Sequence, residues 1–148
     1  MSRPALLTVV LAALALLIPL SPARAEEWPQ VEPAAQSVVR LESLAGQLAA
    51  GITRQVEERG LASEDAREEI AVATAQSLHR ATACLKRRLF DGAEPAELEE
   101  RILELEALSE RVRSAGAKIG LYGYLREKLA AFLNERDWLK RHYGLDRR

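Results

Sequence analysis

The residues most able to bind a metal ion or act as a nucleophile are few in this chain. They are two histidines, His79 and His142, and a single cysteine, Cys84. On a helix, the five-residue spacing of His79 and Cys84 turns their side chains about 140° apart, so they do not predict a shared zinc ion. The chain also lacks the Cys-x-x-Cys-His stretch of covalent haem attachment. We therefore expect no metal, haem or other cofactor.

Cys84 is the candidate reactive thiol. The basic run Lys86–Arg88 follows it closely, and positive charge favours the nucleophilic thiolate form. The same helical face carries small and apolar residues, which favours a half-buried, inert thiol instead. An exposed Cys84, having no partner cysteine in the chain, would be a candidate for an intermolecular disulfide. The basic run itself is a candidate anion site, although charges at a helix end are commonly solvated.

No other group of residues predicts catalysis. The paired carboxylates Glu99–Glu100 lie in a highly charged stretch, whereas general acid–base work needs carboxyl groups in unlike, partly buried surroundings. Gly116, Gly120 and Gly123 do not follow the spacing of a phosphate-binding loop, and no predicted strand precedes them. We interpret them as residues that let the third and fourth helices approach closely at the turn, or that unwind the start of the fourth helix. The protein is not predicted to be an enzyme.

The last helical stretch carries most of the aromatic residues. Tyr124, Ala131, Trp138 and His142 recur at spacings of seven, seven and four, which places them on one side of a helix, away from its apolar face. Tyrosine and tryptophan commonly anchor protein interfaces, and basic residues steer association with an acidic partner. We predict that Tyr124, Trp138, His142 and Arg141 form a partner-binding surface; the alternative is that this stripe contacts a second helix of the bundle. The basic residues near it are Arg136, Lys140, Arg141, Arg147 and Arg148.

Apolar residues at spacings of three and four predict the first two helices. The first is expected from Pro33, after a polar leader over 26–32, to a C-cap at Gly60. Its buried face is predicted to be Val38, Leu41, Ala45, Leu48, Ile52 and Val56. The second is expected from an N-cap at Ser63 to the stop at Asp91–Gly92. Its buried face is predicted to be Ala71, Ala75, Leu78, Thr82, Leu85 and Leu89.

The same spacing predicts two further helices. Glu94–Pro95 opens the third, because proline is well tolerated in the first turn, and Ala115–Ala117 is the expected break. The predicted face of the third helix is Leu98, Ile102, Leu105, Ser109 and Val112. The predicted face of the fourth is Leu121, Tyr122, Leu125, Leu129, Phe132, Leu139 and Tyr143. The fold class is therefore all-α, a small antiparallel bundle of about four helices without disulfides.

The amino-terminal residues predict export. Arg3 is followed by an uncharged apolar run, Ala5–Leu20, and by the small residues Ala23 and Ala25 of a signal-peptidase site. The run is shorter than the roughly 20 apolar residues of a membrane span. We therefore expect residues 1–25 to be a cleaved signal peptide and residues 26–148 a single periplasmic or secreted domain without a stable membrane span. An uncleaved anchor is the alternative.

The charge balance narrows the class of partner. The chain has 21 basic and 22 acidic side chains, which does not favour nucleic acid as a partner. We expect a protein that binds another periplasmic or envelope protein, as an assembly factor, chaperone-like adaptor or inhibitor. The alternative is a periplasmic sensor that holds a small ligand or a metal ion inside the bundle.

Overall fold

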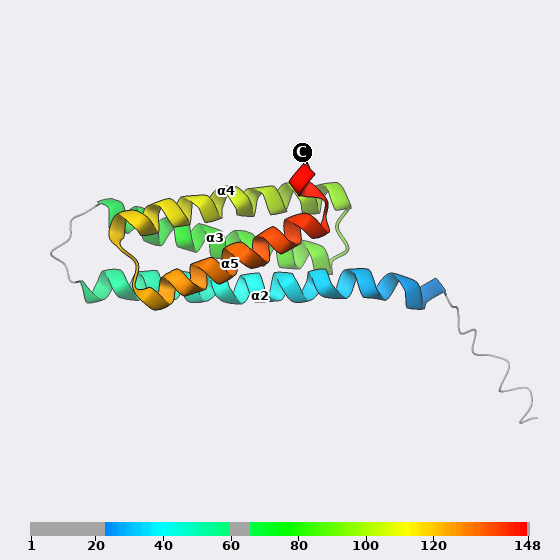
Figure 1. The fold of residues 1–148 in the computed structure, drawn as a ribbon, viewed down its shortest axis with the longest axis horizontal. Coiled ribbons are helices and arrows are strands. Elements are labelled where there is room, and N and C mark those ends of the chain that lie inside the picture. Colours follow the sequence, from blue (N-terminus) through cyan, green and yellow to red (C-terminus); the bar gives the residue numbers. More distant parts are fainter. Residues whose placement is uncertain (1–22, 60–65, 148) are drawn as a thin grey trace, which may run out of the picture. The chain divides into compact units, whose positions relative to one another are not determined.

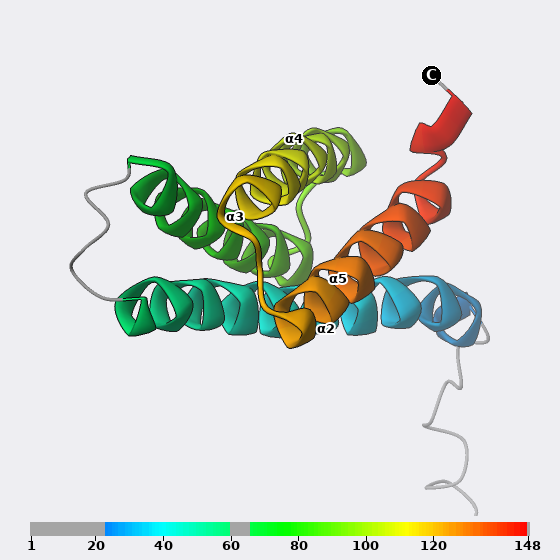
Figure 2. The ribbon, with the colours of Figure 1, turned by 60° about the vertical axis from the view of Figure 1, so that its left-hand side comes forward.

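Four α-helices and a short 3-10 helix make up the computed structural model, which describes residues 23–59 and 66–147. No β-strand occurs among those residues. The elements are α2 (Ala23–Glu58), α3 (Ala66–Phe90), α4 (Pro95–Ile119), α5 (Gly123–His142) and η1 (Leu145–Arg147). Within the compact unit Glu32–Arg148, each helix runs opposite to the one before it (Figure 1). Figure 2 shows α5 crossing α2 obliquely, and α3 packs along α4. The all-helical prediction is confirmed.

The predicted signal peptide lies outside the described residues, except for its last three, which belong to α2. The prediction that the first helix begins at Pro33 is wrong, because α2 already begins at Ala23 and includes the polar leader. The residues between Ala23 and Pro33 include alanine, glutamate and glutamine, which are good helix formers, although a proline inside a helix costs about 3 kcal/mol. The predicted caps at Gly60 and Ser63 also lie outside the described residues. Among those residues, no helix combines the length and hydrophobicity of a membrane span.

The predicted apolar faces form the core. In each helix nearly every member of the predicted stripe is buried, and only residues at the ends of the stripes, such as Val56 and Leu89, are partly exposed. The largest side chain that is fully buried is that of Phe132 of α5. Thr82 is the polar member of the α3 stripe, and its hydroxyl donates to the carbonyl of Leu78 at 3.1 Å, one turn earlier. This bond satisfies a buried hydroxyl without a partner from another helix.

The helix ends are only partly as predicted. Asp91–Gly92 follows the end of α3 and Pro95 begins α4, both as expected. The expected break at Ala115–Ala117 is wrong, because α4 continues to Ile119 and ends at Gly120, whose φ of 67° is left-handed. Gly116 instead makes room for Leu121: a Cβ at Gly116 would lie 2.6 Å from the Leu121 Cδ1 atom. The glycine allows a tight turn to fold back on α4 and does not interrupt the helix.

The turn between α4 and α5 is held by the end of α2. The fully buried Gln55 donates from Nε2 to the Gly120 carbonyl at 3.0 Å and accepts at Oε1 from the Tyr122 N–H at 2.9 Å. Arg59 donates to the Gly120 carbonyl at 2.8 Å, and its guanidinium lies 5.5 Å from the centre of the Tyr122 ring. One amide side chain thus caps the end of one helix and the start of the next.

Two glycines within α2 provide a matched test of the packing. A Cβ at Gly51 would lie 2.4 Å from Cδ2 of the buried Leu125, whereas a Cβ at Gly46 would lie 3.2 Å from Nε2 of the partly exposed His79. Alanine gains about 1 kcal/mol of helix propensity at either position. Overpacking at position 51 costs about 1–3 kcal/mol, so Gly51→Ala is expected to lower the free energy of unfolding and Gly46→Ala to leave it unchanged or raise it. Urea unfolding measures both; equal effects would contradict the close α2–α5 packing.

Candidate partner-binding surface

The end of α5 carries an aromatic cluster formed by Trp138, His142 and Tyr143. The ring of Trp138 stacks on that of His142 with centroids 5.1 Å apart and planes 15° apart. His142 in turn meets Tyr143 edge-on, with centroids 5.3 Å apart. Trp138 also packs partly against the core, while His142 and the neighbouring Arg141 are exposed. Trp138 therefore both packs against the core and forms part of the aromatic cluster at the surface.

Tyr124 does not join this aromatic cluster. It lies at the start of α5, 45% exposed, with its ring centre 6.3 Å from that of Tyr122. Trp138 lies fourteen positions after Tyr124. That separation corresponds to about 21 Å along a helix, at 1.5 Å per residue. The structure thus brings together three of the four predicted surface residues, Trp138, Arg141 and His142, and leaves Tyr124 apart.

A shallow apolar groove between α2 and α3 was missed from the sequence. It is lined by Val39, which is 47% exposed, and by Phe90, which is 62% exposed. The remaining lining residues are Ala35, Gln36 and Arg40. Each of the two apolar residues directly follows a member of a core stripe, Val38 or Leu89, and so turns about 100° away from the core. That adjacency is the sequence signal that could have revealed the groove.

An ion pair connects this groove to α5. Arg40, which lines the groove, reaches Glu135 of α5 with 3.1 Å between Nη2 and Oε1. Glu135 lies one helical turn before Trp138. We call the groove residues Val39, Arg40 and Phe90, together with the aromatic cluster, the three-helix surface. It contains exposed apolar atoms, aromatic rings and basic groups, which are the side-chain types that anchor protein interfaces.

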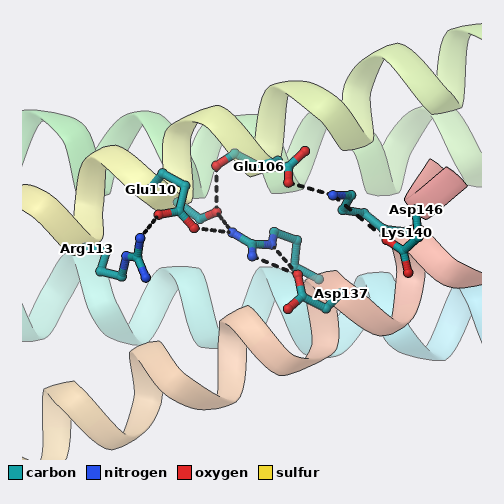
Figure 3. Close-up of polar contacts among 8 residues, drawn as sticks. Glu106, Glu110, Arg113, Asp137, Lys140 and Asp146 are labelled. Atoms are coloured by element: carbon teal, nitrogen blue, oxygen red, sulfur yellow. Dashed lines mark hydrogen bonds and ion pairs between the residues drawn. The ribbon is translucent and has the colours of Figure 1, made fainter. Parts of the chain in front are cut away.

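A polar network links α4 to α5 (Figure 3). Arg136, one of the basic residues near the predicted stripe, is buried, because it falls on the core stripe one turn after Phe132. Its Nη1 donates to the Ser109 hydroxyl at 2.6 Å and to Glu110 at 3.1 Å, and its Nη2 lies 2.7 Å from Asp137. Burial alone would lower the pKa of Arg136, but the hydrogen bonds to Asp137 and Glu110 outweigh it and raise that pKa.

Lys140 extends the same network. Its Nζ lies 2.6 Å from Glu106 of α4 and 4.0 Å from Asp146 of η1 (Figure 3). The side chain of Lys140 is only 15% exposed. Arg136 and Lys140 therefore both hold α5 against α4. Arg141, which remains exposed, is the basic residue of this turn that a partner can reach.

Cys84 and the basic run after it lie within α3. Cys84 is partly buried, which agrees with the half-buried thiol expected from its neighbours. Lys86 forms an ion pair with Glu42 of α2, and Arg88 forms one with Glu97 of α4 at 2.9 Å. Two of the three cations of the candidate anion site therefore already tie α3 to its neighbours. Among residues 23–59 and 66–147, no cluster of three histidine, cysteine or acidic side chains is placed to hold a metal ion.

Comparisons with known proteins add no relative. No protein-family model matches the chain, and neither the curated proteins nor the solved structures include a significant match.

The buried arginine gives a test of the network. Ser109→Ala removes one acceptor of a guanidinium that is almost fully buried, which we expect to lower the free energy of unfolding by about 1–3 kcal/mol. Arg113→Ala removes a second partner of Glu110, but its side chain is 63% exposed, so the expected loss is below about 1 kcal/mol. Denaturant unfolding of both variants checks this order. Equal losses would show that the Ser109–Arg136 bond does not matter more than a surface ion pair.

Tyr143 gives a test of the aromatic cluster. Burial raises the pKa of its phenol above the ordinary value of 10.0. The neutral phenol is therefore favoured in the folded state, and its contribution to stability is present below pH 10 and is lost as the pH rises through the raised pKa. We expect the absorbance difference between the wild type and Tyr143→Phe to titrate above pH 10 while the protein remains folded. A midpoint at or below 10 would contradict the burial of this ring.

Proposed function

We propose that this protein is an exported helical binding protein that recognises another protein of the periplasm or cell envelope through the three-helix surface. An assembly factor, a chaperone-like adaptor and an inhibitor all act by such binding. The observation that carries the proposal is the exposure of Phe90 and Val39 in one groove, joined through Arg40 to the helix that bears Trp138.

The exposed apolar groups support the proposal energetically. Burying a phenylalanine or valine side chain that is now in water contributes about 1.5–3 kcal/mol when complete. Phe90 and Val39 are about half exposed or more, so a partner that covers both would gain part of that amount for each. Interfaces are commonly dominated by a few such anchors within a polar rim.

The charges around the surface indicate what kind of partner fits. Arg87 lies one turn before Phe90 on α3 and is exposed, and Arg141 is exposed beside the aromatic cluster. Arg40 is 60% exposed despite its ion pair with Glu135. A partner segment with apolar side chains flanked by aspartate or glutamate would therefore match both the groove and its rim. The alternative function, a sensor holding a ligand or metal inside the bundle, is favoured by no observation among the described residues.

Site-specific photo-crosslinking tests the proposed surface. A photoreactive residue is placed singly at positions 90, 138 and 124 of the full chain, and crosslinking is performed in the cells that produce it. We expect the same envelope protein, identified by mass spectrometry, at positions 90 and 138. Position 124 is the matched control, because Tyr124 is an exposed aromatic of the same helix outside the surface, and it should capture nothing.

Affinity measurements with the captured protein complete the test. Phe90→Ala and Trp138→Ala are each expected to weaken binding about tenfold or more, which corresponds to about 1.4 kcal/mol or more, while Tyr124→Ala leaves it within about twofold. Circular dichroism controls for folding. Different partners at positions 90 and 138, or equal effects of all three variants, would refute the surface. An uncleaved precursor in the cytosol would refute the export on which the proposal rests.

A further inference from the structure

The outward face of α4 is divided by charge. Glu100 and Glu104 are exposed in the first half of the helix, and Arg111 and Lys118 are exposed in the second. The helix dipole favours acids in the first turn and bases in the last, but its influence falls off within a turn. Glu104 and Arg111 lie in the middle of α4, well away from both ends. The dipole therefore does not account for them.

The four charges share their face with small and apolar residues. Positions 100, 103, 104, 107, 111, 114 and 118 are separated by helical spacings that place them along one side of the helix. Leu103 is 47% exposed, and Ala107 and Ser114, both small, are exposed on the same side. The small side chain of Ala107, one turn after Leu103, permits another helix to approach closely at this point.

The basic half of this face borders a groove toward α3. The groove is lined by Ile70, Thr74, Arg111, Ser114 and Lys118, together with Arg67 and Ala115. Ile70 is 57% exposed. Within the described residues, neither Arg111 nor Lys118 takes part in an ion pair, whereas Glu104 pairs with Arg101 of its own helix at 3.0 Å. A negatively charged helix segment would supply the partners that these two cations lack, and the first half of α4 is such a segment.

We propose that a second copy of this chain docks on this face, with the two α4 helices antiparallel and a twofold axis close to Ala107. In this register Glu104 of each copy lies opposite Arg111 of the other, and Glu100 lies opposite the stretch from Ser114 to Lys118. A parallel arrangement would instead place acids against acids and bases against bases. The two-fold interface is self-complementary, as closed dimers require. The Leu103 side chains of the two copies lie on opposite sides of the axis, and each can pack against Ala107 of the other copy.

This dimer is independent of the proposed partner-binding function. The three-helix surface is built from α2, α3 and α5, whereas the dimer uses the outward face of α4 and the groove beside Ile70. Docking of a second copy would bury Leu103 and Ile70, two of the exposed large apolar residues of the described chain. It would also present two copies of the partner-binding surface in one particle, which raises avidity for a repeated or dimeric partner.

Charge reversal with mixing tests the dimer. Sedimentation equilibrium of the mature protein, at concentrations up to the order of 100 μM, should fit a dimer whose dissociation constant rises with salt as the ion pairs are screened. The variant Glu100→Lys with Glu104→Arg and the variant Arg111→Glu with Lys118→Glu place like charges across the axis. Each is expected to weaken the dimer at least tenfold. Mixing the two variants should restore a dimer, because each then complements the other.

The mixing experiment distinguishes a variant that has lost the dimer contact from one that has lost its fold, because only a folded variant can form a dimer on mixing. A monomeric wild type, a dimer that neither variant weakens, or two folded variants that stay monomeric on mixing would each overturn the proposal. Disulfide crosslinking in a Cys84→Ser background provides a measurement that does not depend on the charge variants folding. Ala107→Cys should form a covalent dimer under mild oxidation and Ser114→Cys should not, since positions 114 of the two copies lie far apart in an antiparallel pair. The reverse result would also overturn the proposal.

Discussion

The need to hydrogen-bond buried polar side chains fixes the position of α5, and the surface carried by α5 depends on it. Gln55 is fully buried and finds its donor and its acceptor on the two sides of the α4–α5 turn. Arg136 is almost fully buried and finds acceptors on Ser109 and Glu110 of α4. An unsatisfied buried group of this kind costs about 1–3 kcal/mol or more, so a shift of α5 along its neighbours is opposed at both of its ends.

Ion pairs between helices also restrain the positions of the other helices of the bundle. Ion pairs link α2 to α3 through Lys86, α2 to α5 through Arg40, and α3 to α4 through Arg88. Exposed pairs of this type contribute little individually, about 0–1 kcal/mol, so the apolar core and the buried polar bonds carry most of the stability. A chain with a single cysteine has no internal disulfide to compensate for loss of that packing. The position of the aromatic cluster therefore depends on the packing of α5 against the core of the bundle.

The parts of the fold that follow from periodicity were predictable. A side chain every three or four residues must face the same way on a helix, so the core stripes and the backbone bond of Thr82 could be read directly. Gly116 was misinterpreted because a helical glycine that admits Leu121 and a glycine that ends a helix look alike in sequence. Gly120, four residues later, has the left-handed conformation that ends α4. Only the position of a neighbouring side chain distinguishes the two roles.

The candidate site was predictable only where it depended on one helix. Trp138 and His142 are one turn apart, so their stacking follows from helical spacing. Val39 and Phe90 share a groove between α2 and α3, and Arg40 reaches Glu135 of α5. These contacts between helices depend on the tilt and offset of the bundle and are not encoded in any single stripe. Arg136 and Arg141 show the same limit: they are identical in type and five residues apart, yet one is sheltered by Ser109 and the other is exposed. Two polar residues in the core stripes of neighbouring helices indicate a hydrogen bond inside the bundle. Basic residues outside such pairs remain available to a partner.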